Sequence, residues 1–515
     1  MAYLLGFVVV GAACSSSGNG NGGPIDAPVD TVGGAHRPNI VFILTDDLNV
    51  EVYGHMPRLK AALDAKGTAF RNHFLNISLC CPSRTAILRG QYAHNTHIFT
   101  NAPPNGGFET FYADKSEDQT VGVWLQAAGY HTGFFGKYLN GYPNTASQTY
   151  IPPGWAEWAS PVAGNPYSEY NYTLNDNGTL VVHGAAPSDY MVDVISAKAV
   201  DFIHRAAQSP GTPFFLYLTP YVPHAPATPA PRYANDFLTA QAPRTPSFNE
   251  ADVSDKPAWL AARPLLTDVQ IAAIDALYRK RLASMEAIED LVDNVIAALD
   301  AAQLLDTTYV FFSSDNGFHQ GQHRLPSGKN TEFDEDLFVP LIVRGPGVPA
   351  GRTLDHFTVN CDFAPTFVEL AGAAIPGIVD GRSLVPLLGA SPPPTSVWRQ
   401  LVLLEHAADV TGLKPRPPEI AGTLEPPDTA TADELVAAVV SADPPPFLGI
   451  RTAAYTFIEY ASGEKELYDH AADPDQLQNI AATADPALLS RLAALAHGMR
   501  DCQGAACRTA EMMTR

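Results

Sequence analysis

Apolar and polar residues alternate along the chain in blocks whose spacing predicts an α/β fold. The apolar runs are short, and the segments between them have helical spacing. The runs are Asn39 to Leu44, Thr132 to Gly136, Pro213 to Thr219 and Tyr309 to Ser314, and the helical segments are Val121 to Ala128, Asp193 to Ala207 and Ile271 to Ala301. This alternation is typical of a mostly parallel sheet sandwiched by helices.

The pattern changes beyond Val385, where short strands precede a closing helix from Pro486 to Met499. The strands are expected at Leu401 to Glu405, Leu448 to Arg451, Thr456 to Glu459 and Glu466 to Tyr468. We therefore expect a main domain over residues 38–390 and a smaller C-terminal α+β subdomain over residues 391–515. Cys502 and Cys507 close a short polar loop beside the last helix, where we expect a disulfide.

The first residues predict export. Met1 to Ala13 are almost wholly apolar or small, and the tether over residues 15–37 is rich in Gly, Ser and Pro. The apolar run is too short to span a bilayer, as expected of a cleaved signal. Residues 1–14 resemble a bacterial lipoprotein signal with Cys14 as lipid anchor, and a plain secretory signal is the alternative. We expect a protein on the membrane surface, in the periplasm or secreted.

Composition limits the partners. The chain has 515 residues, 46% hydrophobic and 17% charged, and can bury a large core. Its 54 acidic and 32 basic side chains give a formal net charge of −22 at pH 7. Such a surface repels nucleic acid and anionic membranes, so we expect no nucleic-acid partner. An anionic substrate would need a local cationic pocket.

Each of the four apolar runs of the main domain ends in residues that carry chemistry. In chain order these are Asp46 with Asp47, Lys137, His224, and Asp315 with Asn316. Ligand sites of open α/β sheets lie beyond the carboxyl ends of the strands, so these side chains are expected to meet in one crevice. Taken singly, Asp46 and Asp47 are also typical of a helix N-cap, and Asn316-Gly317 of a hairpin turn. Recurrence at four strand ends favours one site.

Three carboxylates in one crevice require a cation, because like charges about 4 Å apart repel by roughly 4 kcal/mol at an effective dielectric near 20. Carboxylate and amide oxygens suit a hard cation, which predicts a Ca²⁺ site with Mg²⁺ as the alternative. The expected ligands are Asp46, Asp47, Asp315 and Asn316. Successive side chains of a strand point to opposite faces, so Asp46 and Asp47 can share an ion only where the strand has ended.

The stretch from Cys80 to Arg84 reads Cys-Cys-Pro-Ser-Arg. A cysteine is often only a small buried hydrophobe. This stretch, however, resembles the C-x-P-S-R signature of the sulfatases, and Gly129 to Leu139 resembles the second signature of that family. Over residues 38–515 the resemblance extends to N-acetylglucosamine-6-sulfatases, on stretches such as Tyr170 to Leu174 and Val339 to Gly347. It implies an alkaline-phosphatase-like fold and hydrolysis of sulfuric esters.

The resemblance also implies residue roles. Cys80 is converted to formylglycine (3-oxoalanine) by a formylglycine-generating enzyme, and it completes the metal sphere. Arg84 and Lys137 hold the aldehyde hydrate, while His224 and Lys329 contact the sulfate and the leaving oxygen. Leu139 replaces a histidine that many members place beside the hydrate, which leaves the base of the last step open.

The expected reaction has two steps. One hydroxyl of the hydrate attacks sulfur in line with the leaving alcohol, which His224 or Lys329 protonates. The metal, Arg84, Lys137 and Lys329 neutralise the sulfuryl oxygens. Loss of a proton from the second hydroxyl then ejects sulfate and restores the aldehyde, a step that a serine ester does not offer.

The resemblance implies an exo-acting enzyme on 6-O-sulfated N-acetylglucosamine-type glycans. The candidate substrate-binding residues are His94, His97, Asn101, His319 and His323. A promiscuous arylsulfatase is an alternative, as is a phosphodiester or phosphonate monoester hydrolase of related fold. A non-catalytic glycan-binding lipoprotein is the third hypothesis. The complete C-x-P-S-R context favours a sulfur ester over a phosphorus ester.

Overall fold

The computed structural model describes residues 37–407 and 444–513. The signal over residues 1–14, the tether up to residue 36 and the lipid-anchor prediction for Cys14 lie outside these ranges. No helix in the described part of the chain is both long and apolar enough to cross a membrane.

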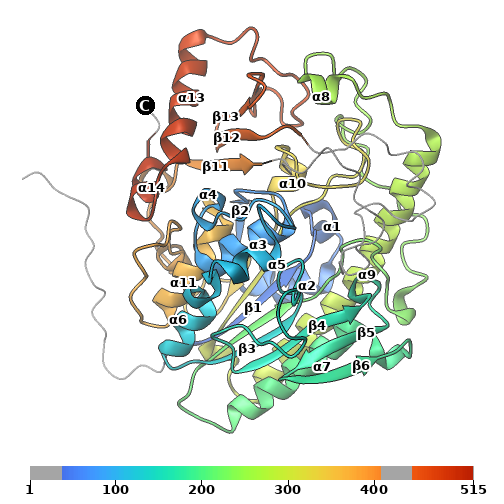
Figure 1. The fold of residues 1–515 in the computed structure, drawn as a ribbon, viewed down its shortest axis with the longest axis vertical. Helices are drawn as coiled ribbons and strands as arrows, with labels where there is room; N and C mark the ends of the chain where they lie inside the picture. The colour runs from blue at the N-terminus through green and yellow to red at the C-terminus, as the bar shows by residue number, and fades with distance from the viewer. Residues whose placement is uncertain (1–36, 408–443, 514–515) are drawn as a thin grey trace, which may run out of the picture. The chain divides into compact units, whose positions relative to one another are not determined.

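The described residues form a ten-stranded sheet and a separate four-stranded sheet (Figure 1). Across the large sheet the strands follow in the order β10 (Arg352–Val359), β2 (Thr68–Phe74), β9 (Ile342–Arg344), β8 (Thr308–Ser314), β1 (Asn39–Thr45), β7 (Phe214–Thr219), β3 (His131–Gly136), β4 (Glu157–Gly164), β5 (Tyr172–Asp176) and β6 (Thr179–His183). The five strands from β8 to β4 are mutually parallel. The predicted mostly parallel sheet is confirmed.

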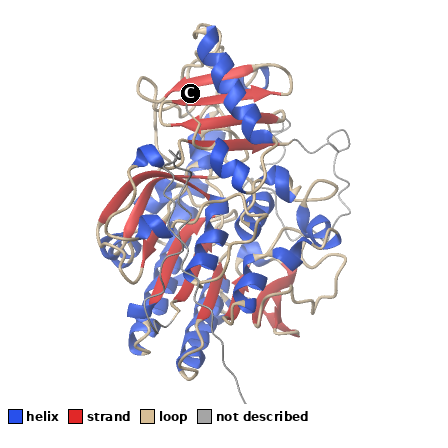
Figure 2. Ribbon diagram, turned by 90° about the vertical axis from the view of Figure 1, so that its left-hand side faces the viewer, coloured by secondary structure: helices blue, strands red, loops and turns tan. Residues whose placement is uncertain are grey.

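The central strands are apolar on both faces. All seven residues of β1 are buried, with Val41 and Ile43 in one core and Ile40 and Phe42 in the other. Strands covered on both faces read as continuous hydrophobic runs, which is why these segments were recognisable in the sequence. Helices cover both faces, as Figure 2 shows.

Two sets of helices form these layers. On one face lie α7 (Met191–Ala207) and α9 (Asp268–Ala301), and on the other lie α3 (Cys80–Arg89), α6 (Val121–Ala127) and α11 (Phe363–Leu370). The α9 helix begins where Thr267 and Gln270 cap each other reciprocally, three residues before the start expected from periodicity. The short helices are α1 (Val50–Gly54), α2 (Pro57–Ala62), α4 (Ala93–Thr96), α5 (Gly107–Ala113), α8 (Ala258–Ala261), α10 (Asp334–Leu337) and α12 (Val385–Leu388).

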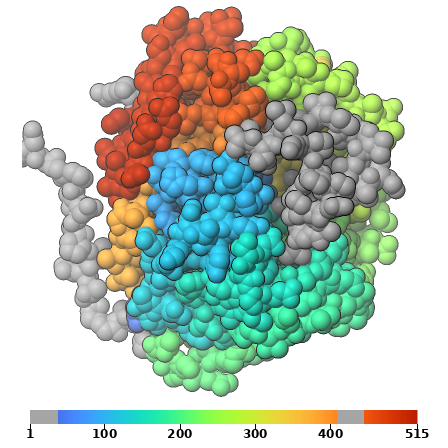
Figure 3. Space-filling view, in the orientation of Figure 1, coloured from blue at the N-terminus to red at the C-terminus, as the bar shows by residue number. Residues whose placement is uncertain are grey.

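The second sheet is antiparallel and confirms the predicted C-terminal α+β fold. Its strands follow in the order β11 (Leu401–His406), β12 (Phe447–Thr452), β13 (Tyr455–Tyr460) and β14 (Lys465–Asp469). The sheet shares a core with α13 (Pro486–Arg500), and α14 (Ala505–Ala510) follows. Cys502 and Cys507 are joined as a disulfide before and within α14. In the space-filling view these orange and red residues adjoin the blue N-terminal part of the described chain (Figure 3).

Candidate active site

Four neighbouring strands of the large sheet deliver the polar residues expected to converge. The order β8, β1, β7, β3 places four parallel carboxyl ends side by side. The residues that follow these strands are Asp315 with Asn316, Asp46 with Asp47, His224, and Lys137. All six are buried. The residues predicted to converge therefore follow neighbouring strands at the middle of the sheet.

Cys80 lies within this cluster as the first residue of α3. Its Sγ is 3.6 Å from Asp46 Oδ1, and Lys329 Nζ is 2.8 Å from the same sulfur. Lys329 Nζ also donates to Asp47 Oδ1 over 2.7 Å. Burial raises the pKa of the Cys80 thiol well above its ordinary value. An unmodified Cys80 is therefore a protonated thiol and a poor nucleophile.

The signature around Cys80 suits the first turn of a helix. Pro82 stands at the third helical position, where no helix hydrogen bond requires its missing N–H. The Cys81 N–H donates to Asn101 Oδ1 over 3.0 Å, which satisfies another group of that turn. The helix ends at Gly90, whose φ of 64° is the left-handed conformation that glycine adopts without strain.

Two further cations face the remaining carboxylates. Lys137 Nζ donates to Asp46 Oδ2 over 2.7 Å, and Arg84 Nε donates to Asp315 Oδ2 over 2.7 Å. Burial alone would raise the pKa of Asp46, but the positive charges of Lys137, His224 and Arg84 hold it below its ordinary value. Burial outweighs Arg84 at Asp315, whose pKa is raised. Charge is thus offset residue by residue inside a buried site.

The oxygen donors of the site fit a hard divalent cation. Ligating atoms of Asp46, Asp47, Cys80 and His224 lie within 4.8 Å of one another. Asp47 Oδ2 and Asn316 Oδ1 are buried and accept no hydrogen bond from the described residues. Buried oxygens without a donor are costly unless a cation binds them. Asp315, which we expected as a ligand, has its Oδ2 engaged by Arg84 and its Oδ1 by the Asp47 N–H at 3.1 Å.

Sequence reasoning missed an aromatic wall beside the cations. Lys137 Nζ lies 5.0 Å from the ring centre of Tyr167 and 6.0 Å from that of Tyr221. The ring of Tyr167 also packs on His224, with centroids 4.6 Å apart. Tyr167 lies just before Tyr170 to Leu174, one of the stretches that carry the family resemblance. Nothing in the spacing of Tyr167 itself indicated that its ring faces a cation.

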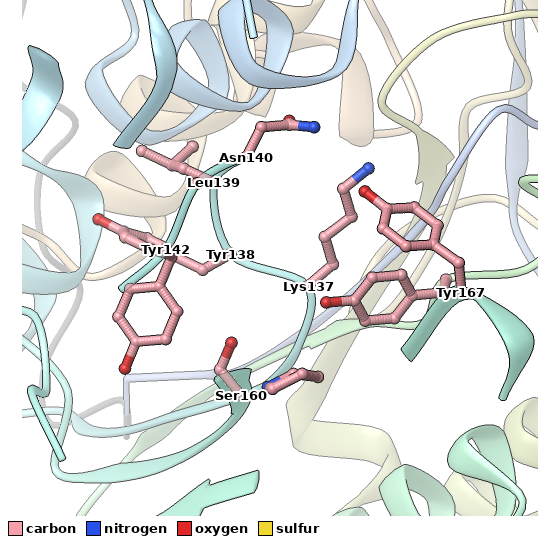
Figure 4. Close-up of a pocket in the computed structure, with 10 residues that line it drawn as sticks. Lys137, Tyr138, Leu139, Asn140, Tyr142, Ser160 and Tyr167 are labelled. Atoms are coloured by element: carbon pink, nitrogen blue, oxygen red, sulfur yellow. The ribbon is translucent and has the colours of Figure 1, made fainter. Parts of the chain in front are cut away.

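A pocket opens beside Lys137 and this wall (Figure 4). Its lining residues come from the loop after β3, from β4 and from the aromatic wall. They are Lys137, Tyr138, Leu139, Asn140, Gly141, Tyr142, Ser160, Pro161, Tyr167 and Tyr221. Ser160 is buried in this lining, and its hydroxyl has no hydrogen-bond partner among the described residues. The space adjoining Lys137 is therefore polar as well as aromatic.

Two candidate substrate-binding residues lie next to the centre. Asn101 holds the N–H of Cys81. His319 pairs by backbone hydrogen bonds with Gly328, the neighbour of Lys329, and its Nδ1 contacts Asp336 Oδ2 at 2.9 Å. Its Nε2 is buried and has no partner in the described structure.

The other three candidates are His94, His323 and His97. His94 Nδ1 contacts Glu405 Oε1 at 2.8 Å; burial alone would lower the pKa of His94, but the hydrogen bond and charge of Glu405, together with the Cys502 carbonyl and Asp380, raise it. His323 contacts Glu250 at 2.7 Å, and burial lowers its pKa. His97 is exposed at the end of α4. Glu405 and Glu250 thus hold His94 and His323, and a part of these three residues in substrate binding stays a prediction.

Buried cations and a fitting metal site at the carboxyl edge of this sheet define a hydrolase of anionic esters. The family model described as "Sulfatase" matches residues 38–373 of this chain. Human N-acetylglucosamine-6-sulfatase is 34% identical over 496 residues, which cover 92% of this chain and 87% of the relative. The chain belongs to the sulfatase family, and it is a sulfuric ester hydrolase.

Solved structures share the fold. One, of a protein in complex with its substrate D-glucosamine-2-N,6-O-disulfate, superposes with a TM-score of 0.69 at 23% identity, covering 90% of this chain and 97% of that one. A phosphonate monoester hydrolase from Silicibacter pomeroyi gives a TM-score of 0.64 at 23% identity, covering 90% and 96%. At these identities the likeness concerns the fold alone.

Proposed function

We propose that the protein removes 6-O-sulfate from N-acetylglucosamine-type residues of sulfated glycans, using a formylglycine formed from Cys80. The observation that carries the proposal is the position of Lys329. Its ammonium contacts both Cys80 and the carboxylate of Asp47, so a sulfate that reaches residue 80 meets a buried cation there. The similarity to human N-acetylglucosamine-6-sulfatase supports the substrate class.

Asp46, Asp47, Asp315, Asn316 and residue 80 would hold the divalent cation, for which we propose Ca²⁺ with Mg²⁺ as the alternative. When bound, the cation would lower the pKa of a coordinated hydroxyl and polarise the sulfate. Formylglycine would supply, as its hydrate, one hydroxyl for attack on sulfur and a second for release of sulfate.

The cations of this chain have separate tasks. Lys137 donates to Asp46 and Lys329 donates to Asp47, and together the two ammonium groups would neutralise the sulfuryl oxygens. Arg84 reaches Asp315 and the Lys137 carbonyl, so it would fix both the helix that starts at Cys80 and the loop after β3.

His224 is our candidate for proton transfer to the leaving oxygen. Its Nδ1 faces the Ala225 carbonyl at 2.7 Å, which fixes that nitrogen as a donor. Its Nε2 is then the nitrogen turned toward Asp47 Oδ2, 3.7 Å away. Because Leu139 offers no base, we assign the later proton removal to the same imidazole.

Mass spectrometry of the tryptic peptide Asn72 to Arg84 tests the modification. Protein isolated from a host with a formylglycine-generating enzyme should carry an aldehyde at Cys80 and a thiol at Cys81. Cys80→Ala should abolish turnover, while Cys81→Ala is the matched control that leaves the C-x-P-S-R spacing intact. A thiol at Cys80 in fully active enzyme would contradict the formylglycine mechanism.

A substrate panel tests the ester class. Glucosamine 6-O-sulfates and their N-acetyl forms should be turned over faster than an aryl sulfate, an aryl phosphate diester or a phosphonate monoester. The phosphonate arm is included because a hydrolase of that class shares the fold. Preference for the phosphonate would establish the alternative function, and equal rates on aryl sulfates would indicate a promiscuous arylsulfatase.

Export with lipid attachment at Cys14 is a separate proposal, supported by the apolar first residues. Fractionation of cells that express the full chain tests it. The protein should follow the membrane fraction, and Cys14→Ala should release it.

A further inference from the structure

Arg281 lies in the middle of α9, directly beneath the site, and its side chain is fully buried. One terminal nitrogen, Nη2, donates to the Asp47 carbonyl over 2.5 Å and to Asn49 Oδ1 over 3.2 Å. The other, Nη1, donates to the Pro223 carbonyl over 3.1 Å. The guanidinium also lies over the ring of Phe318, with its carbon 4.3 Å from the ring centre.

These contacts reach three different strand ends. Asp47 and Asn49 follow β1, Pro223 follows β7 and immediately precedes His224, and Phe318 follows β8. No carboxylate of the described residues forms an ion pair with Arg281, and the nearby charges of Asp47 and Glu51 offset its burial only in part. Burial lowers the pKa of Arg281 to about 10. The two terminal nitrogens of the planar guanidinium donate hydrogen bonds to backbone carbonyls instead of to a carboxylate.

The backbone conformation of Asp47 explains why the contacts of Arg281 matter for the site. Asp47 has a φ of 66°, the left-handed conformation that residues with a Cβ rarely adopt. In an extended strand Asp46 and Asp47 would point to opposite faces. The turn at Asp47 ends the extended backbone, and the carboxylates of Asp46 and Asp47 lie in one cluster. Arg281 donates a hydrogen bond to the carbonyl of this turn.

We propose that Arg281 is a positioning residue of the active site, holding the Asp47 turn and the loop before His224 at a fixed separation. The inference rests on the proposed function for its catalytic readout only. Its direct consequence is geometric. Loss of the guanidinium removes a restraint on the backbone of Asp47 and on the loop before His224 together, while the Asp47 carboxylate keeps Lys329 and Asp46 keeps Lys137.

The test compares Arg281→Lys with Arg281→Met and with the matched control Arg279→Lys. Arg279 lies on the same helix and donates to the Ala240 carbonyl, away from the site. Lysine keeps the charge but presents a single ammonium, so it cannot reach both carbonyls. It also gives a folded variant if the methionine variant does not fold.

Two readouts are measured on purified full-length protein. Calorimetric titration with Ca²⁺ alone should give roughly 10- to 100-fold weaker binding for Arg281→Lys, the loss typical when a residue that orients metal ligands is changed. With the sulfated sugar, kcat should fall at least tenfold while KM changes little. Arg279→Lys should match the parent in both.

Unchanged Ca²⁺ affinity and kcat in folded Arg281→Lys would overturn the proposal. So would a lower melting temperature of the metal-free protein accompanied by normal Ca²⁺ affinity, because that result shows a purely structural role. If the parent protein hydrolyses no sulfate ester, the proposed function fails, while a weakened Ca²⁺ affinity in Arg281→Lys still supports the positioning role.

Discussion

Lys329 places a positive charge directly against Cys80. Its ammonium contacts Asp47 and Cys80 and has under a twentieth of its surface exposed. Removing one preorganised donor from such a site typically costs 10² to 10³ in kcat. We expect Lys329→Met to lower kcat on the sulfated sugar by about that factor, measured by steady-state kinetics. Lys66→Met, at an exposed lysine, is the control, and equal kcat in both variants would contradict the assignment.

Among single residues, the sequence predicted the site residues that come directly after a strand. Asp46, Lys137 and Asp315 were recognisable because each follows a buried apolar run. Tyr167 was not, because its part depends on which side chains the fold brings against its ring. Arg281 had a weak signal, since it continues the buried face of α9 four and seven residues before Met285 and Ile288.

Among the elements, the loop that carries Lys329 leans on the C-terminal sheet. Asn330 contacts His406 of β11 at 3.2 Å, and Asp334 pairs with Arg451 of β12 at 3.0 Å. Between them Glu332 is buried beside Glu466 of β14. The position of Lys329 therefore depends on a sheet that supplies no residue to the cluster around Cys80.

The pair of buried carboxyls predicts a pH dependence of stability. Burial raises the pKa of both Glu332 and Glu466, and the like charge of Glu466 raises that of Glu332 further. Unfolded glutamates ionise near pH 4.5, so above that pH the folded state binds more protons than the unfolded state. The stability that these protons contribute is present at acid pH and is lost as pH rises through the raised pKa values.

Glu332→Gln should remove part of this loss. One proton difference corresponds to about 1.4 kcal/mol per pH unit, so the variant should gain in melting temperature relative to the parent between pH 5 and pH 9. Calorimetric scans at both pH values measure the effect, with Glu369→Gln as the control outside this cluster. A pH-independent difference between variant and parent would contradict the account.

Hydrophobic spacing predicted the main helices and strands closely. It did not predict which strands lie next to one another in the sheet. The segments expected from Asp193 and Ile271 appear as α7 and α9, extended at their starts by two and three residues. The insertion of the short antiparallel β9 between β2 and β8 had no sequence signal, because a three-residue strand shows no periodicity.

For the molecule as a whole, a buried ion network joins the large sheet's side to the C-terminal residues. Arg399 binds Asp362 with both terminal nitrogens, at 2.5 and 2.7 Å, and its Nε lies 2.9 Å from Glu511. Breaking one partner of such a network strands buried charge, which costs about 3–5 kcal/mol.

Arg399→Leu should therefore lower the free energy of unfolding by about 3–5 kcal/mol, measured by denaturant titration. Arg71→Leu breaks an exposed pair with Asp355, whose side chains are 65% and 61% exposed, and should change stability by about 1 kcal/mol or less. Similar small losses in both variants would show that the network adds nothing.

The pairing of every site cation with a carboxylate affects how substrate arrives. Because Lys137, Lys329 and Arg84 are screened at 2.7 Å by acidic partners, an approaching polyanionic glycan meets mainly the field of a chain with net charge −22. Mobile ions shorten the reach of that repulsion to roughly 8 Å at physiological ionic strength. Added salt should thus accelerate encounter with long sulfated chains and leave a sulfated monosaccharide nearly unaffected.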